Sequence, residues 1–136
     1  MLWVNKEVEA EQVRIEFLDI TAAIIRLPER QVLVVSVYVP GEDPPPALRD
    51  TCNNLYKAIY DVRRNAGTVV DVVIARDFNR HDQLWGGEDV SLERQGEVDP
   101  IIDLMSEFAL SSLLRRGTKI WHGGNYKTTI DLVLAS

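Results

Sequence analysis

The sequence predicts an α/β fold in which helices pack on mixed sheets. A strand is predicted over residues 69–75, which end in a short apolar run from Val72 onward, and such a run, rich in β-branched side chains, is typical of a strand buried on both faces. An amphipathic helix closely precedes this run, and helix–strand pairs joined in this way are typical of layered α/β domains. The chain has 136 residues, enough for one domain with its own core. We therefore expect a single domain over residues 1–136.

The first third of the chain is predicted to form a β-hairpin with an edge strand beside it. Residues 21–27 and 32–39 both have strand composition, and the four residues between them suit a hairpin connection. Residues 3–17 contain apolar side chains without a clear period. We expect one or two edge strands there.

The middle of the chain is predicted to be helical. Gly67 stands where a left-handed residue often ends a helix. Cys52 is the only cysteine, so no internal disulfide can form, and its apolar neighbours favour a core thiol over a catalytic one. Apolar residues recur at steps of three and four, which gives the helix one buried face; they are Leu48, Cys52, Leu55, Ile59 and Val62.

A long loop and a second helix follow. Residues 79–98 are polar and rich in Gly, Asp and Glu, and loops of this length are usually functional or mobile. Asp99 is predicted to cap the next helix, because Pro100 follows it and proline suits the first helical position. The buried stripe of this helix is predicted to comprise Ile101, Leu104, Met105 and Phe108.

Three further strands are predicted near the end of the chain, at residues 110–114, 119–121 and 129–134, with a turn at 123–125. Asp131 lies within the last of these strands. An unpaired buried acid is costly, so we expect Asp131 to have a structural or catalytic partner.

The charge of the chain argues against simple electrostatic adhesion to nucleic acid. The formal net charge is −6, and a negative protein repels phosphate. An enzyme that meets phosphate through a divalent metal is still compatible, since metal sites are built from acids. No apolar run approaches the roughly 20 residues that span a bilayer, so we expect no membrane segment.

Polar residues stand at the ends of three predicted strands: Tyr38, the pair Asp77 and Asn79, and Asp131. If they meet at one rim, they could hold a phosphate, a water and a metal, the parts that phosphodiester hydrolysis needs. An ionised acid can orient or deprotonate water, and an amide or a phenol can donate to a phosphate oxygen. The structural alternative is that the acid and the amide are turn residues and that the tyrosine only packs.

The order and spacing of these motifs resemble the endonuclease/exonuclease/phosphatase superfamily. Residues 79–87, NRHDQLWGG, are similar to the nuclease domain of LINE-type retrotransposon polyproteins. The resemblance covers residues 21–136. It implies a partial four-layer α/β sandwich of mixed sheets flanked by helices, DNA as substrate and Mg²⁺ as cofactor. It also favours an intracellular location, with the nucleus as one option.

The same resemblance implies a role for each site residue. Tyr38 corresponds to a tyrosine on the phosphate side, and Asp77 to the acid that handles the attacking water or the leaving group. Asn79 corresponds to the amide that orients the scissile phosphate. Asp131 corresponds to the acid that holds the catalytic histidine in its useful tautomer.

Three departures from the family pattern predict that the chain alone is impaired or inactive. The family's general-base histidine belongs to a Ser-Asp-His motif further along the chain, and neither His81 nor His122 stands in that context. No counterpart of the family's metal-holding Glu precedes Thr21, so the metal ligands are unknown. Arg76 replaces the usual Gly before the acid, where it could fill the phosphate position or lower the basicity of Asp77.

Other functions stay open. The main alternative is a non-catalytic remnant that binds nucleic acid or a partner chain. A phosphatase acting on small phosphoesters or phospholipids is a third hypothesis, against which the Trp-Gly pair of the loop argues by resemblance. Because strands from both ends of the family fold are not found, we expect a fragment that exposes apolar sheet surface and self-associates through it.

Overall fold

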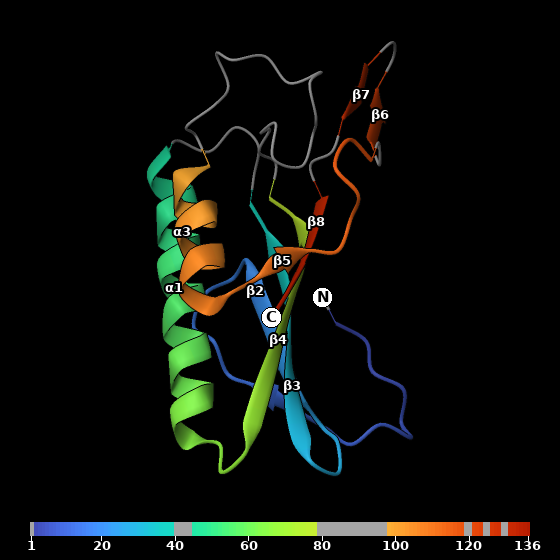
Figure 1. The fold of residues 1–136 in the computed structure, drawn as a ribbon, viewed down its shortest axis with the longest axis vertical. Helices are drawn as coiled ribbons and strands as arrows, with labels where there is room; N and C mark the ends of the chain where they lie inside the picture. The colour runs from blue at the N-terminus through green and yellow to red at the C-terminus, as the bar shows by residue number, and fades with distance from the viewer. Residues whose placement is uncertain (1, 40–44, 79–97, 119–120, 124–125, 129–130) are drawn as a thin grey trace.

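A mixed sheet is the centre of the fold in the computed structural model, which describes residues 2–39, 45–78, 98–118, 121–123, 126–128 and 131–136. In this part of the chain six strands pair in the order β1-β2-β3-β4-β8-β5 (Figure 1). Two short strands, β6 (Trp121–Gly123) and β7 (Tyr126–Thr128), pair with each other separately. The strands of the main sheet are β1 (Ala10–Val13), β2 (Ile20–Arg26), β3 (Arg30–Tyr38), β4 (Val69–Asp77), β5 (Ser111–Ser112) and β8 (Asp131–Ala135).

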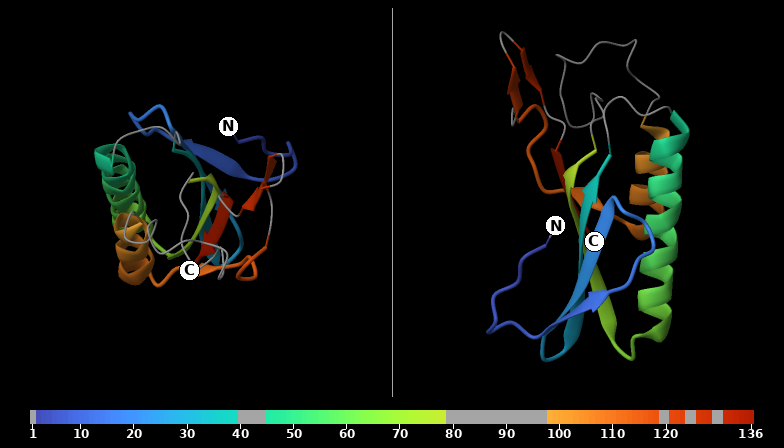
Figure 2. Two further views of the ribbon diagram at one scale, coloured as in Figure 1. Left: turned by 90° about the horizontal axis from the view of Figure 1, so that it is seen from above. Right: turned by 180° about the vertical axis from the view of Figure 1, so that it is seen from behind.

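Both helices lie on the same side of this sheet. Figures 1 and 2 show α1 (Pro45–Asn65) and α3 (Asp99–Phe108) side by side against one face, so the described chain forms a helical layer and a sheet layer. The predicted α/β class is therefore confirmed. In the described residues no helix has both the length and the apolar character needed to cross a membrane.

The predicted hairpin and edge strand are confirmed. β2 and β3 pair antiparallel from Ile20↔Val37 to Arg26↔Gln31, and the Leu27 N–H donates to the carbonyl of Arg30 at 2.9 Å across the turn. β1 pairs antiparallel with β2 at the edge of the sheet.

β3 and β4 pair in parallel over nine positions, from Arg30↔Val69 to Tyr38↔Asp77. Parallel strands require a crossover connection, and α1 lies in the segment that connects this pair. The beginning of the pairing is reinforced by polar contacts. The Thr68 hydroxyl donates to the carbonyl of Glu29 at 3.0 Å, and Arg30 pairs with Asp71 at 2.8 Å.

Alternation along the strands fills the space under the helices. Alternate apolar side chains of β3 and β4 are buried, and the apolar stripe predicted for α1 packs against them; they are Leu33, Val35, Val37, Val70, Val72 and Ile74. Cys52 and Met105 both belong to this core, as predicted, Met105 being partly buried. The helices meet through aromatic rings: Phe108 of α3 lies 5.3 Å from Tyr56 and 5.1 Å from Tyr60 of α1, measured between ring centroids.

The predicted left-handed end of α1 is wrong. Gly117 has a left-handed φ of 81°, whereas Gly67 does not. The helix ends at Asn65 with the Ala66 N–H donating to the carbonyl of Val62 at 3.0 Å. The Arg63 guanidinium then donates to the carbonyl of Val70 at 3.2 Å. The chain therefore passes from helix to strand through these contacts, without a glycine cap.

The predicted start of α3 is wrong by one residue. Val98 is the N-cap, with no side-chain hydrogen bond, and Asp99 is already helical. Val98 is fully buried, and its carbonyl accepts from the N–H groups of Ile101 at 2.8 Å and Ile102 at 3.1 Å. Burial of this apolar residue fixes where the helix begins, while Asp99 lies in the first turn, where an acid suits the helix dipole.

The last predicted strands are only partly reproduced. Of residues 110–114 only Ser111–Ser112 form a strand, β5, which pairs with β8. The Leu113 N–H also donates to the carbonyl of Val133 in β8 at 2.8 Å. β8 confirms the predicted strand from Asp131 onward, and Trp121 belongs to β6. Predictions for residues 119–120, 124–125 and 129–130, and for the loop over 79–97, lie outside the described residues.

The alternation in β4 gives a matched pair of substitutions. Val72 is fully buried and Val69 is 60% exposed on the same strand. Val72→Ala should lower the free energy of unfolding by about 2 kcal/mol, because it removes buried methyl groups and leaves a cavity. Val69→Ala should change it by less than about 0.5 kcal/mol. Urea denaturation measures both, and equal losses would contradict the observed burial.

Candidate functional site

The ends of three neighbouring strands bring Tyr38, Asp77 and Asp131 into one row of the sheet. Tyr38 ends β3 and Asp77 ends β4, and the parallel register pairs them. Asp131 begins β8, and the antiparallel register pairs it with Asp77. Directly paired residues have Cα atoms about 5 Å apart. Three segments far apart in the sequence therefore contribute to one edge, which we call the site row.

Tyr38 and Asp77 of the site row lie on the side of the sheet that the helices leave uncovered, which we call the open face. Val37 and Leu132, one position further into the sheet, are buried on the helix side. Side chains alternate between the faces of a strand, and Tyr38 is accordingly 51% exposed while Asp77 is half-buried. A phenol and a carboxylate are thus accessible at this edge.

Buried residues directly after the row fix its position. Val39 follows Tyr38 and Phe78 follows Asp77, and both are fully buried. The Val39 N–H donates to the carbonyl of Asp77 at 2.8 Å, which extends the parallel ladder beyond the row. Packing of these two apolar side chains, together with this hydrogen bond, holds the strand ends in register.

The structure adds Asp19 to the surroundings of the row. The Tyr38 N–H donates to the carbonyl of Asp19 at 2.9 Å, so Asp19 lies beside Tyr38 just before β2 begins. A turn presents it: the Ile20 N–H donates to the carbonyl of Phe17 at 3.2 Å, with Leu18 fully exposed at the tip. Sequence analysis missed this residue. The available signal was an acid directly before an apolar strand, the same order as Asp131 shows at the start of β8.

Other predicted site residues are only partly within the described part of the chain. Asn79 and His81 lie outside it, and so do the side chains of Asp131 and His122. Arg76 has a register position between Val37 and Leu132, in the row next to the site row. The suggested effects of Arg76 on phosphate or on Asp77 stay predictions.

The donor set of the row is compatible with Mg²⁺ but small. Asp77 and Asp131 occupy adjacent register positions, and Mg²⁺ is often held by one or two carboxylates with waters and substrate phosphates completing its coordination. Among the residues that the structure describes, no group of three or more His, Cys, Asp or Glu could hold a metal ion.

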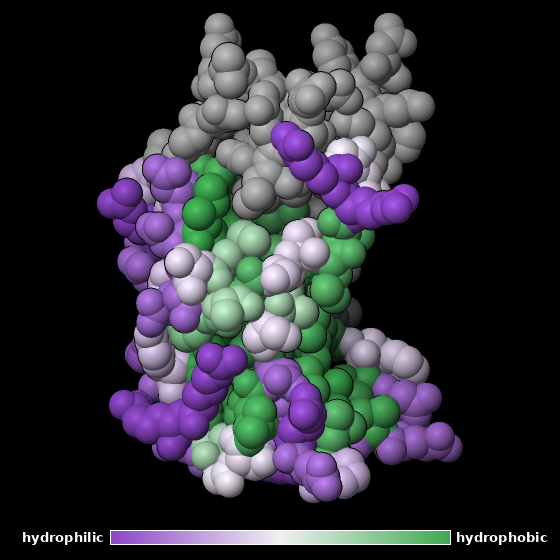
Figure 3. Space-filling model, in the orientation of Figure 1, coloured by the Kyte–Doolittle hydropathy of each residue, from purple (hydrophilic) through white to green (hydrophobic). Residues whose placement is uncertain are grey.

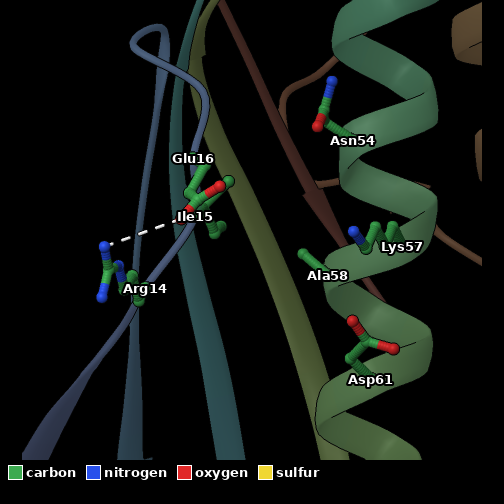
Figure 4. Close-up of a pocket in the computed structure, with 7 residues that line it drawn as sticks. All are labelled: Arg14, Ile15, Glu16, Asn54, Lys57, Ala58 and Asp61. Atoms are coloured by element: carbon green, nitrogen blue, oxygen red, sulfur yellow. Dashed lines mark ion pairs between the residues drawn. The ribbon is translucent and has the colours of Figure 1, made fainter.

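A surface groove of about 370 Å³ lies elsewhere, between residues 14–16 and the middle of α1 (Figure 4). Arg14 and Glu16 form an ion pair at 3.6 Å across one of its walls, and their side chains are 90% and 84% exposed. Such an exposed pair contributes little. The groove contains none of the predicted site residues, so the site row is the better candidate for chemistry.

Comparison with known proteins agrees with this arrangement. The family model described as "Endonuclease-reverse transcriptase" matches residues 32–136. The chain belongs to this endonuclease-reverse transcriptase family. The match begins in β3 and includes the whole site row. It confirms the resemblance to retrotransposon nucleases that the motifs indicated.

Among solved structures, the fold is similar to the endonuclease domain of TRAS1, a telomere-specific non-LTR retrotransposon. The TM-score is 0.71 at 17% identity, and the match covers 97% of this chain and 57% of that chain. This family member therefore shares the TRAS1 domain fold while spanning little more than half of that chain's length. No curated protein matches the chain.

The single thiol of the chain offers a test of burial near α3. Burial, and secondarily the nearby Asp103 carboxylate, raise the pKa of Cys52 from its usual value near 9.0 to about 12. The unfolded chain therefore releases this proton first as the pH rises. Keeping the thiol neutral in the folded chain contributes to the free energy of unfolding. This contribution is fully present below about pH 9 and is lost as the pH rises toward about 12.

Wild type should consequently lose more stability than Cys52→Ala when the pH is raised from about 8 to about 10. Urea denaturation at the two pH values measures this difference. The variant keeps Tyr56 and Tyr60, whose pKa values are also raised, so their contribution cancels. Identical pH dependence in the two proteins would show that the thiol is not held neutral by the fold.

Proposed function

We propose that this chain is a nuclease domain that hydrolyses phosphodiester bonds in DNA and is impaired when it acts alone. The observation that carries the proposal is the site row, in which one register joins Tyr38, Asp77 and Asp131. It occurs in a member of the endonuclease-reverse transcriptase family. Residues 1–136 are proposed to form a single domain that carries this function. DNA as substrate implies an intracellular and, in a cell with a nucleus, a nuclear site of action.

Each residue of the row has a proposed part in the reaction. Asp77 orients or deprotonates the attacking water, which an ionised carboxylate can do in a partly buried position. The exposed phenol of Tyr38 donates to a non-bridging phosphate oxygen and so stabilises the charge that develops there. Asn79 follows Asp77 closely and is proposed to orient the scissile phosphate.

Asp77 and Asp131 are the residues proposed to hold Mg²⁺ together with the substrate phosphate. When bound, the metal would offset the negative charge of the phosphate during attack. It would also reduce the repulsion expected between DNA and a chain of net charge −6.

The proposed impairment follows from the lack of a histidine in the sequence context of the family's general base. The only histidines are His81 and His122, and both stand outside the sequence context of the family's catalytic histidine. Asp77 alone is a weak base near neutral pH. Slow turnover is therefore the expected behaviour of the isolated chain.

Nicking of supercoiled plasmid in the presence of Mg²⁺, with protein in excess, tests the function. Slow nicking by wild type should be lost in Asp77→Asn and in Asp131→Asn. Asp71→Asn is the matched control, because Asp71 lies on the same strand and face as Asp77 but pairs with Arg30 at the opposite end. It should nick like wild type, since an exposed ion pair contributes at most about 1 kcal/mol to stability.

Circular dichroism establishes that all four proteins are folded. Equal nicking by every variant would identify a contaminating nuclease and overturn the proposal. A folded wild type without any nicking would equally reject hydrolysis by this chain.

A second candidate function is non-catalytic binding of a partner chain or of nucleic acid. The open face favours a partner chain, because the described residues leave its apolar side chains without a covering layer. If wild type and Asp77→Asn bind DNA equally and neither cleaves it, the result would instead favour non-catalytic binding of nucleic acid.

A further inference from the structure

The pairing of β2 with β3 adds a fourth residue to the site row. The antiparallel register pairs Ile20 with Val37, which places Asp19 opposite Tyr38. The Tyr38 N–H donates to the carbonyl of Asp19 at 2.9 Å, as expected for directly opposite residues. β1 pairs with β2 further into the sheet, at Ala22–Ile25, and so leaves Asp19 at the end of the row. The row extended in this way crosses β2, β3, β4 and β8.

The side chain of Asp19 lies on the same face of the sheet as that of Tyr38. Ile20 and Val37, the next pair into the sheet, are buried on the helix side. Because side chains alternate between the faces of a strand, Asp19 and Tyr38 both point to the other face. Directly opposite residues have Cβ atoms about 5 Å apart. The half-buried carboxylate of Asp19 is therefore a neighbour of the exposed phenol of Tyr38.

The charge of Asp19 is not neutralised by an ion pair within the part of the chain that the structure describes. Arg14 is the cation closest to Asp19 in the sequence, and it pairs with Glu16 at 3.6 Å. Aspartate is ionised at neutral pH. A negative charge thus stands beside the phenol that is proposed to bind a phosphate.

This charge has a direct consequence for a bound phosphate backbone. Each strand of DNA carries one negative charge per about 3.4 Å of helix axis, so a phosphate at Tyr38 brings others with it. Two unit charges about 6 Å apart in water repel each other enough to weaken binding about threefold. Asp77 and Asp131 are proposed to have their charge offset by Mg²⁺, whereas Asp19 lies on the other side of Tyr38.

We propose that Asp19 sets the affinity of this site for DNA, because its carboxylate repels phosphates at the β2 end of the row. Asp19 touches no reacting atom in this scheme and acts by repulsion alone. The inference rests on the proposed function, since it takes DNA as the ligand of the row and Tyr38 as a phosphate contact.

Fluorescence anisotropy of a labelled DNA duplex tests this inference in EDTA, which removes the metal that cleavage is proposed to need. At about 0.05 M salt, Asp19→Asn should bind the duplex about threefold more tightly than wild type, and Asp19→Lys about tenfold. The gain should shrink as the salt rises to about 0.3 M, because screening then acts over the distance between the charges. Asp19→Glu keeps the charge and should bind like wild type.

Glu29→Gln and Glu29→Lys are the matched controls, because they change the net charge of −6 by the same amounts. Glu29 lies between β2 and β3 at the opposite end of the sheet, about 30 Å from Tyr38 by the rise of β3. Figure 3 shows many hydrophilic residues at this lower end of the molecule. Both controls should bind DNA like wild type.

Several outcomes would overturn the inference: unchanged affinity in Asp19→Asn, equal gains at Asp19 and Glu29, a gain that is insensitive to salt, or no DNA binding by any of the proteins. Circular dichroism checks folding, and Asp19→Ser is the second neutral variant should Asp19→Asn fail to fold. Plasmid nicking separates the two proposals. Nicking that Asp77→Asn abolishes, with unchanged affinity in Asp19→Asn, would reject the role of Asp19 and keep the nuclease. Tighter binding by Asp19→Asn without any nicking would reject hydrolysis and keep the effect of Asp19 on binding.

Discussion

The parallel pairing of β3 with β4 is the constraint on which the rest of the structure depends. It holds nine positions in register, and its last pair is Tyr38↔Asp77. A parallel pair forces the chain to cross over between the two strands, which places α1 against the sheet and creates the core. A shift of one residue in this pairing would move every side chain of β4 to the other face. Core and site row are thus set by one register.

The sequence predicted most of the elements because their patterns are local. The period of Leu48, Leu55 and Ile59 indicates a helix with one buried face, and the apolar run after it indicates a strand. The expectation that this strand is buried on both faces is not met in the described residues, because the helices cover one face only. Element ends were harder. Gly67 is a good candidate for a helix cap, yet the transition from α1 to β4 is held by Arg63 and the backbone. Val98 caps α3 because it is buried, which no local pattern specifies.

For the site, sequence analysis identified the residues but not their arrangement. Tyr38, Asp77 and Asp131 were recognised as polar residues at strand ends, while their meeting depends on the strand order β3-β4-β8. That order brings the last strand beside β4 instead of beside its neighbours in the sequence. Asp19 was missed for the same reason, since its closeness to Tyr38 follows only from the pairing of β2 with β3.

The burial of both Phe78 and Val98 has an evolutionary consequence. These residues bracket residues 79–97, and each is packed in the core with no exposed surface. The separation between the two anchor points is therefore set by the core, whatever lies between them. Lengthening a segment between fixed ends costs only about 0.6 kcal/mol for each doubling. A change in the length of this segment is thus compatible with the same core and the same sheet.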